Sequence, residues 1–472
     1  MKTKIRLLCF FMLTLNLGNC KSDSELKIIE NLTNNDKSNS QKKINKILYK
    51  PIYDESGNET FISKTYYNKI LDESKSNPSI EIINESNIDK AKLASYNDNK
   101  QIIKKYNPDI LIEPDQNRIK IYDNSLKPIK SIDFIVKEED LQSSTEKLVY
   151  YGTNRDIKNR SGINDYFGID RSEKITYGFC KINIPGYKYR ERGDLNTPYV
   201  ILNKEIYKSE KRHFYIKETP TVLSEEDFIK QLNVDLSNNI NKKKVLIFLH
   251  GYNTSFNDAA LKTAQLTHDL QFEGTSIFYS WPSRAEKLGY PADENESRNS
   301  QHNLIEFLSR IYSNNRFTDI YIIAHSLGTR LISEIIYSDT KKIPNFKTKT
   351  KILVLAAPDI DPVYFRNSVA PSFAALKSSI TIYANKNDKA LSLSEQFHDS
   401  NRVGSISPSD NIYPYIETID ATGTGEDFLD HSYFSDSYKL LNDMVYLLKG
   451  IKAKNRDLLQ INSKNGFYWR IQ

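Results

Sequence analysis

The chain has 472 residues and a formal net charge of +6, and its composition excludes several classes of protein. Three of the positive charges, Lys2, Lys4 and Arg6, lie in the first 19 residues, which leaves a net charge of +3 from Cys20 onward. So small an excess argues against a nucleic-acid-binding protein, because such proteins need clustered cations to neutralise phosphates. Three cysteines cannot form a disulfide framework. Beyond the N-terminus, no apolar run approaches the ~20 residues that span a bilayer.

The first residues predict a signal peptide over residues 1–19, with a cationic start and the short apolar stretch Leu7–Leu17. The ending Leu17-Gly18-Asn19-Cys20 resembles a bacterial lipobox, although Ala or Gly is commoner than Asn at position 19. This resemblance implies that Cys20 is lipidated and becomes the mature N-terminus of an exported lipoprotein. The protein would then be anchored to a cell-envelope membrane, on the periplasmic side or at the cell surface. The alternative is an ordinary signal peptide followed by a chance cysteine.

Composition divides the rest of the chain into four parts. Residues 20–46 are rich in Lys, Asn, Ser and acidic residues, which predicts a flexible tether. Residues 47–145 predict a small α+β module of unknown role. Residues 148–450 predict the main domain, and residues 451–472 a C-terminal tail. The module has three strand-like segments: Ile110–Glu113, Arg118–Tyr122 and Ile132–Val136.

The main domain begins with a β-rich extension and continues with alternating strands and helices. The extension has strand-like segments at Leu148–Tyr151, Lys174–Ile184 and Arg212–Ile216. Ser224 then caps an expected helix whose first turn is acidic. Further strands are expected at Val245–Leu249, Thr275–Tyr279, Asp319–Ile323, Lys351–Leu355, Ile380–Ala384 and Ile412–Thr418. Helices are expected at Asp258–Leu270, Ser300–Ile311, Leu327–Tyr337 and Ser435–Leu448. The alternation predicts an α/β fold with a doubly wound, mostly parallel sheet.

One turn in this domain has the pattern of a nucleophile elbow. The apolar strand Asp319–Ile323 leads into Ala324-His325-Ser326-Leu327-Gly328, and a helix follows. Small residues on both sides of a serine allow neighbouring elements to approach a strained turn between strand and helix. The pattern therefore predicts Ser326 as a nucleophile. The alternative is a serine that only caps the following helix.

A serine nucleophile also needs donors for the oxyanion and a histidine base. The strand Val245–Leu249 ends in His250-Gly251, so the backbone N–H groups of Tyr252 and Leu327 are the expected donors. In the chain order Ser–Asp–His, the base lies downstream of Ser326, which leaves His398 and His431. His431 is preferred because it follows the last expected strand of the domain.

The acid that orients the histidine is expected to be Asp388, four residues beyond the strand Ile380–Ala384. Asp359 and Asp361, one strand earlier, are the alternatives. A turn aspartate that binds its own backbone is a further alternative for each of them. No metal-binding or phosphate-binding motif is present, so no metal and no cofactor are expected.

Together these motifs resemble the bacterial α/β-hydrolases of the DUF900 type. Six blocks occur in the order of that family: His250-Gly251-Tyr252-Asn253-Thr254-Ser255-Phe256, Phe278-Tyr279-Ser280-Trp281-Pro282-Ser283, Ala324-His325-Ser326-Leu327-Gly328, Ala356-Ala357-Pro358-Asp359, Asp388-Lys389-Ala390-Leu391 and His431-Ser432-Tyr433-Phe434. An upstream block also resembles the segment before the hydrolase core: Tyr151-Gly152-Thr153-Asn154-Arg155 with Tyr177-Gly178-Phe179-Cys180 and Ile184-Pro185. The resemblance covers about residues 148–450 and implies the α/β-hydrolase fold.

The sequence therefore favours a membrane-anchored serine hydrolase whose substrate is an ester or another acyl compound. Ser326, His431 and Asp388 would form its triad, and Pro282–Gln301 is long enough to border the site. Two other functions stay open. One is a lipoprotein scaffold that kept the fold without catalysis, and the other is an acyltransferase.

Overall fold

The computed structural model describes residues 143–201, 204–206, 208–237, 243–286, 288–424 and 436–472, together with six short strands nearer the N-terminus. Cys20, the predicted signal peptide and His431 lie outside the described residues. The six strands form two small sheets, in the orders β1-β2-β3 and β4-β5-β6. Their bounds are Ile28–Ile29, Asn45–Tyr49, Ile80–Asn84, Ile110–Glu113, Arg118–Ile121 and Phe134–Ile135. The last three correspond to the three strands expected in the module.

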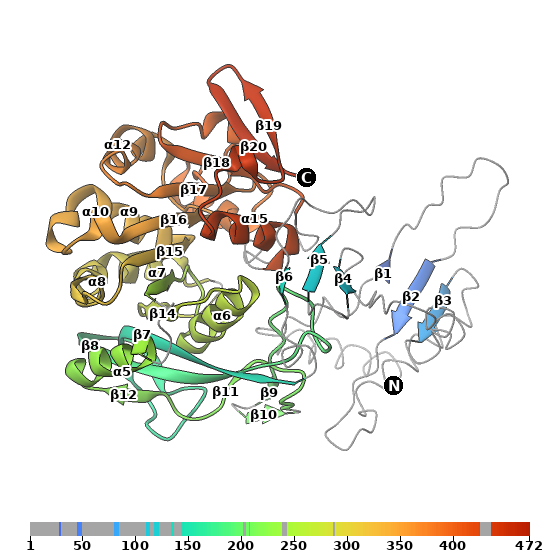
Figure 1. Cartoon of the computed structure of the whole chain (residues 1–472), viewed down its shortest axis with the longest axis vertical. Coiled ribbons are helices and arrows are strands. Elements are labelled where there is room, and N and C mark those ends of the chain that lie inside the picture. Colours follow the sequence, from blue (N-terminus) through green and yellow to red (C-terminus); the bar gives the residue numbers. More distant parts are fainter. Residues whose placement is uncertain are drawn as a thin grey trace, which may run out of the picture. The chain divides into compact units, whose positions relative to one another are not determined.

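The main unit is built on a mixed sheet of twelve strands, counted within the part of the chain that the structure describes. Its order is β11-β8-β7-β14-β13-β15-β16-β17-β18-β20-β19, and β12 also pairs with β8 (Figure 1). All pairs from β7 to β20 are parallel. The strands are β7 (Thr145–Ile157), β8 (Phe167–Ile184), β11 (Tyr215–Ile216), β12 (Thr221–Leu223), β13 (Lys244–Leu249), β14 (Thr275–Ser280), β15 (Asp319–His325), β16 (Thr350–Ala356), β17 (Ser379–Ala384), β18 (Ile416–Asp420), β19 (Leu458–Ser463) and β20 (Gly466–Ile471). The predicted doubly wound, mostly parallel sheet is confirmed.

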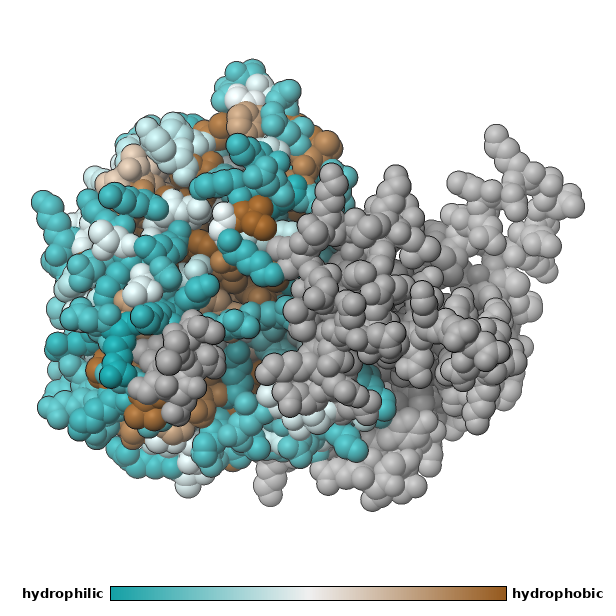
Figure 2. All heavy atoms as spheres, in the orientation of Figure 1, coloured by the Kyte–Doolittle hydropathy of each residue, from teal (hydrophilic) through white to brown (hydrophobic). Residues whose placement is uncertain are grey.

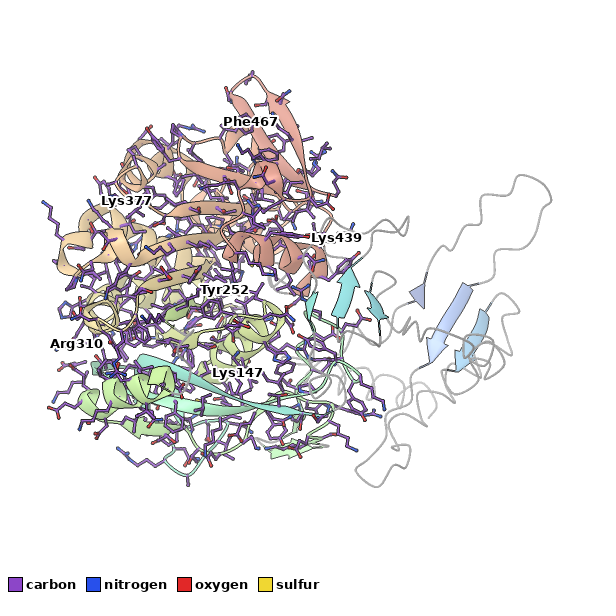
Figure 3. All side chains as sticks on the ribbon, viewed as in Figure 1. Lys147, Tyr252, Arg310, Lys377, Lys439 and Phe467 are labelled. Atoms are coloured by element: carbon purple, nitrogen blue, oxygen red, sulfur yellow. The ribbon has the colours of Figure 1, made fainter. Side chains whose placement is uncertain are left out.

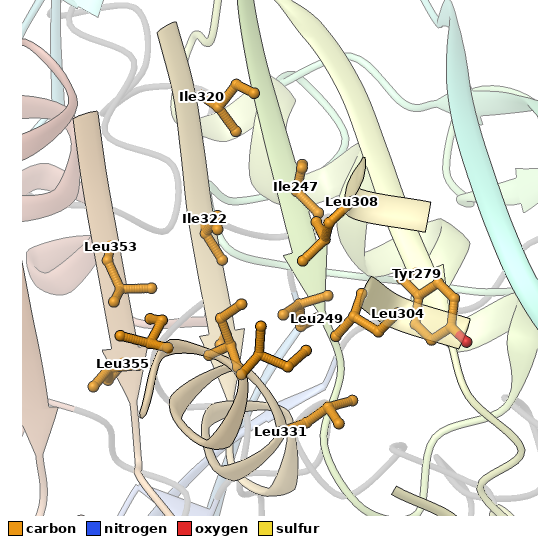
Figure 4. Close-up of a cluster of buried hydrophobic side chains, with 14 of the residues drawn as sticks. Ile247, Leu249, Tyr279, Leu304, Leu308, Ile320, Ile322, Leu331, Leu353 and Leu355 are labelled. Carbon is orange, nitrogen blue, oxygen red and sulfur yellow. The ribbon is translucent and has the colours of Figure 1, made fainter. Parts of the chain in front are cut away.

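Helices cover both faces of this sheet because successive side chains on a strand point to opposite faces. Along β13, Ile247 and Leu249 pack with apolar side chains of α5 (Glu225–Ser237), α8 (Gln301–Ser313) and α9 (Leu327–Ser338). Figure 4 shows this cluster, in which β13, β15 and β16 present isoleucine and leucine side chains toward α8 and α9. On the other face, Leu246 and Phe248 pack with α6 (Phe256–Asp269) and α15 (Tyr438–Leu448).

Shorter helices lie in the segments that connect the strands of the sheet. They are α7 (Tyr290–Asn299), η3 (Thr340–Lys342), α10 (Phe346–Lys349), α11 (Pro362–Tyr364), η4 (Phe365–Val369), α12 (Ala370–Phe373), α13 (Lys389–His398), η5 (Pro408–Asp410) and η6 (Ala453–Asn455). A separate hairpin joins β9 (Tyr199–Ile201) to β10 (Lys204–Ile206). Of these, α7 occupies part of the polar segment that was expected to border the site.

The predicted β-rich extension belongs to the same sheet, in which β7 pairs in parallel with β14. One predicted boundary differs from the structure. Residues 451–472 are not a tail, because they form η6 and a hairpin whose strand β20 pairs in parallel with β18. Trp469 and Ile471 of that hairpin are buried against α15 and its neighbours.

The visible surface of the described residues is mostly hydrophilic, with apolar side chains in small groups (Figure 2). Leu288, before α7, is 89 % exposed and is the most exposed large apolar side chain among the described residues. Within the same residues, no helix combines the length and the apolar character needed to cross a membrane.

Candidate active site

The site lies where the order of the sheet reverses. From β13 the chain passes through α6 to β14 on one side, and then through α7 and α8 to β15 on the other side. The connections that leave the carboxyl ends of β13 and β15 therefore run in opposite directions. Ligands of open α/β sheets bind in the crevice that such a reversal creates. His250-Gly251 leaves β13 at this point, and Ser326 leaves β15.

Ser326 has a strained backbone at the junction of β15 and α9. Its φ is 50° and its ψ is −121°, a conformation that residues other than glycine rarely adopt. The residue is 1 % exposed, and its N–H donates to the carbonyl of Ala356 at 3.0 Å. The turn at Ser326 thus has the strand, sharp turn and helix that its sequence predicts.

Two glycines permit the close packing around this turn. A Cβ atom at Gly251 would lie 2.7 Å from Cβ of Ser326. A Cβ atom at Gly328 would lie 2.6 Å from the carbonyl oxygens of Leu249 and His250, which are backbone atoms with little freedom to move. The His250-Gly251 turn is therefore in direct contact with the elbow, and glycine is the residue that fits at both positions.

The two expected oxyanion donors lie on either side of this contact. Leu327 is the first residue of α9, so its N–H lies at the helix N-terminus, where the helix dipole favours negative charge. Tyr252 directly follows Gly251, and its ring packs edge-on against Tyr290, the first residue of α7, with 5.5 Å between the ring centroids. Figure 3 labels Tyr252, which is half-buried, among the side chains of the main unit.

Three histidines of the main unit are engaged in structural contacts. Burial and the charge of Arg155 lower the pKa of His250 to about 3, and its ring stacks on Trp281 with centroids 4.7 Å apart. Burial and the charge of Arg190 lower the pKa of His268, also to about 3. His398, the alternative base, has Nδ1 2.8 Å from the carbonyl of Ser394 and Nε2 3.1 Å from Glu294. Both nitrogens of His398 are therefore directed at other partners.

The three candidate acids occupy different environments. Asp359 is 1 % exposed, and its carboxylate accepts hydrogen bonds from Tyr290 at 2.7 Å and Ser394 at 2.6 Å. Arg402 Nε lies 3.4 Å from the same carboxylate, so Asp359 is part of a buried polar network. Asp361 caps α11 by accepting the N–H groups of Val363 and Tyr364, each at 2.9 Å.

Asp388 lies in the loop after β17, at the same edge of the sheet as Ser326. It is 5 % exposed, and Oδ1 accepts the N–H of Leu391 at 3.0 Å. Its own N–H donates to the carbonyl of Asn385, which tightens the loop. β18 follows α13 in the chain and ends at Asp420, before the segment that contains His431. His431 itself lies outside the described residues.

Sequence reasoning missed two buried charges beside the site, Arg155 and Asp293. Arg155 ends the upstream Tyr151–Arg155 block, and Asp293 lies in the polar segment before α8. The charged Arg155 in an otherwise unexplained motif could have indicated a role near the site. Its hydrogen-bond partners could not be predicted, because they depend on tertiary contacts. Within the described residues, no group of three acidic, histidine or cysteine side chains is arranged to hold a metal ion.

Comparison with known proteins identifies the family of the main domain. Residues 224–448 match the model of the family described as an alpha/beta hydrolase of unknown function, DUF900. The match does not extend to the upstream block at residues 151–155. No match was found among the curated proteins.

Several solved structures are similar to this chain at low identity. An esterase from Pyrococcus furiosus is 12% identical, with 45% of this chain and 83% of that chain covered and a TM-score of 0.27. An inhibited esterase B from Lactobacillus rhamnosis is 11% identical, with coverage of 44% and 77% and a TM-score of 0.28. Est1E from Butyrivibrio proteoclasticus is 12% identical, with coverage of 45% and 91% and a TM-score of 0.29. The family match and the sheet order together show that residues 224–448 form an α/β-hydrolase domain of the DUF900 family.

Proposed function

We propose that this hydrolase cleaves carboxylic esters with Ser326 as the nucleophile, His431 as the base and Asp388 as the acid. The conformation of Ser326 is the observation that carries the proposal. A serine that only capped α9 would have an extended backbone and would accept a hydrogen bond from the first turn of the helix. Ser326 instead has a positive φ and makes no side-chain capping bond. Strain of this kind costs on the order of 1–3 kcal/mol and is typical of catalytic turns.

The chemistry follows from the position of the elbow. Ser326 Oγ attacks the ester carbon while His431 takes its proton, and the alkoxide leaves with that proton. The backbone N–H groups of Leu327 and Tyr252 stabilise the oxyanion of each tetrahedral intermediate. Water then attacks the acyl-enzyme and releases the carboxylic acid. Asp388 holds the imidazole in the required tautomer and stabilises its cationic form.

The proposal places this activity at a membrane surface. Lipidation of Cys20 would attach several acyl chains to one residue, which binds a membrane more firmly than a single chain. The segment between Cys20 and the main domain would then tether the hydrolase. An ester in or near the membrane is therefore the expected kind of substrate.

The test is labelling with a fluorophosphonate in fractionated cells, combined with turnover of short p-nitrophenyl esters. The probe should modify Ser326 stoichiometrically and appear in the membrane fraction. Ser326→Ala should abolish both labelling and turnover. Ser333→Ala is the matched control, because Ser333 is 1 % exposed on the same helix, α9, but lies outside the elbow. Cys20→Ala should leave the activity but release the enzyme from the membrane or leave the precursor uncleaved.

Full ester turnover by a folded Ser326→Ala protein would overturn the mechanism. A protein that neither reacts with the probe nor turns over any ester would support the scaffold function. Product analysis in the presence of added alcohols separates hydrolysis from acyl transfer, because a transferase would form a new ester in place of the free acid.

A further inference from the structure

Two buried residues of opposite charge bind the loops beside the elbow, and neither residue belongs to those loops. Arg155 is 1 % exposed on β7, and Asp293 is fully buried in the first turn of α7. The loops follow β13 (residues 250–255) and β14 (residues 281–286). The first of them carries Tyr252, the proposed oxyanion donor.

Arg155 binds carbonyl and hydroxyl oxygens. Its guanidinium donates to the carbonyl of Thr254 at 2.8 Å and to the carbonyl of Ser283 at 2.9 Å, one in each loop. It also donates to Ser280 Oγ at 2.9 Å, and that hydroxyl lies 3.2 Å from Nε2 of His250. Arg155 thus holds both loops through their acceptor groups.

Asp293 binds the complementary donors. Its carboxylate accepts the N–H of Asn253 at 2.9 Å, the N–H of Arg284 at 2.7 Å and the hydroxyl of Ser283 at 2.6 Å. Ser283 Oγ in turn accepts the N–H of Thr254 at 3.0 Å and so joins the two loops directly. Asn253 has a φ of 54°, and its bond to Asp293 fixes this left-handed residue directly after Tyr252.

Burial makes these contacts strong and costly to lose. Desolvation lowers the pKa of Arg155 to about 10, so the group stays charged at neutral pH. Burial raises the pKa of Asp293, and the hydrogen bonds from Ser283, Arg284 and Asn253 and the charge of Arg155 oppose that rise. Removing one member of a buried network leaves its partners without hydrogen bonds.

We propose that Asp293 and Arg155 are positioning residues that hold the Tyr252 N–H at the oxyanion site. The assignment rests on the proposed serine mechanism. It gives a role to the upstream Tyr151–Arg155 block, which lies outside the matched family segment. The expected consequence is that disturbing Asp293 weakens stabilisation of the tetrahedral intermediate more than it weakens substrate binding.

The test compares Asp293→Asn with wild type in ester kinetics and in inhibition by an alkyl boronic acid, which forms a tetrahedral adduct on a serine nucleophile. Turnover is expressed per active site, with the sites counted by fluorophosphonate labelling. We expect kcat to fall by about 10²–10³, the scale of losing one oxyanion donor. KM should change by less than about threefold, and boronate affinity should fall in parallel with kcat/KM.

Asp269→Asn is the matched control. Asp269 is a fully buried carboxylate bound by Tyr187 and Arg190 at the far end of α6, about 20 Å along the helix axis from the oxyanion loop. The Asp269→Asn substitution should lower Tm but leave kcat per active site unchanged. If Asp293→Asn does not fold, Ser283→Ala removes only the hydroxyl that joins the loops and should show the same kcat and boronate pattern.

The outcomes separate the inference from the function on which it rests. Wild-type kcat and boronate affinity in folded Asp293→Asn and Ser283→Ala proteins, with Ser326 still labelled, would overturn the positioning role alone. The positioning role would likewise be overturned if both variants lost stability but kept their turnover per active site. A wild-type protein without labelling or turnover would overturn both the function and the inference.

Discussion

At the residue scale, two buried aspartates, Asp359 and Asp388, are candidates for the acid of the proposed triad, and their surroundings differ. Asp359 holds Tyr290 and Ser394 between arginines, and a network of this kind stabilises the fold. Asp388 instead lies in the loop after β17, two strands from the elbow. The two carboxylates should therefore respond differently to the same substitution.

We predict that Asp388→Asn lowers kcat by roughly 10⁴, because the histidine loses the partner that fixes its tautomer. Its Tm should stay close to that of wild type. Asp359→Asn should lower the free energy of unfolding by about 3–5 kcal/mol, because it breaks a buried charged network. Its kcat per active site should change little. Urea unfolding and titrated ester kinetics measure both effects, and the reverse pattern would move the acid one strand earlier.

At the element scale, the sequence predicted the central strands and helices because their periodicity is unambiguous. β13, for example, ends at the expected Leu249, and β17 begins one residue before the expected start. It did not predict α7, because that helix is polar and is held by single buried groups such as Tyr290 and Asp293. Nor could it predict that Arg155 and Asp293 meet the same loops, since that depends on the position of β7 beside β14.

The C-terminal hairpin was missed although a local signal was present. Asn-Gly is a common hairpin signal in a sequence; in the structure Lys464 and Asn465 form the turn, and Gly466, with a φ of 131°, begins β20. The flanking strands bury Tyr468, Trp469 and Ile471 but expose Leu459 and Phe467. This mixed exposure weakens the apolar pattern from which a strand is usually recognised.

The hairpin should be essential for stability. Arg456, just before β19, donates to Asp443 of α15 at 3.0 Å and to Glu417 of β18 at 2.6 Å. A chain that ends at Gly450 loses this cation and leaves the buried carboxylate of Asp443 without it, a loss of about 3–5 kcal/mol. We expect that chain to unfold at a much lower temperature or to aggregate through the exposed edge of β18.

Thermal unfolding followed by circular dichroism checks this expectation. Leu459→Ser is the control, because Leu459 is 46 % exposed on β19 and its loss should cost less than about 0.5 kcal/mol. A truncated chain with the Tm of wild type would show that the hairpin is a dispensable addition to the sheet.

At the scale of the whole molecule, two buried histidines are neutral at pH 7: His250 in the turn after β13, and His268 on α6. His250 stacks on Trp281, and His268 stacks on Tyr187 with centroids 5.2 Å apart. His268 Nε2 has no hydrogen-bond partner among the described residues. Burial lowers the pKa of each histidine to about 3, whereas an unfolded histidine has a pKa of about 6.5.

Stability should therefore fall as the pH falls from 7 to 5. In this range the unfolded chain binds protons at both histidines, and the folded protein does not. Each histidine should reduce the free energy of unfolding at pH 5 by about 2 kcal/mol, at 1.36 kcal/mol per pH unit below 6.5. The raised pKa values of Asp293 and Asp443 act with the opposite sign, because these carboxyls bind protons more readily in the folded state.

Urea unfolding at pH 7 and pH 5 measures the difference. In His268→Gln the drop between the two pH values should be about 2 kcal/mol smaller than in wild type, because one of the two histidines is gone. His302→Gln is the control and should show the wild-type drop, since His302 lies exposed on α8. An unfolding free energy that does not change between pH 7 and pH 5, or an unchanged drop in His268→Gln, would show that these histidines accept protons in the folded protein.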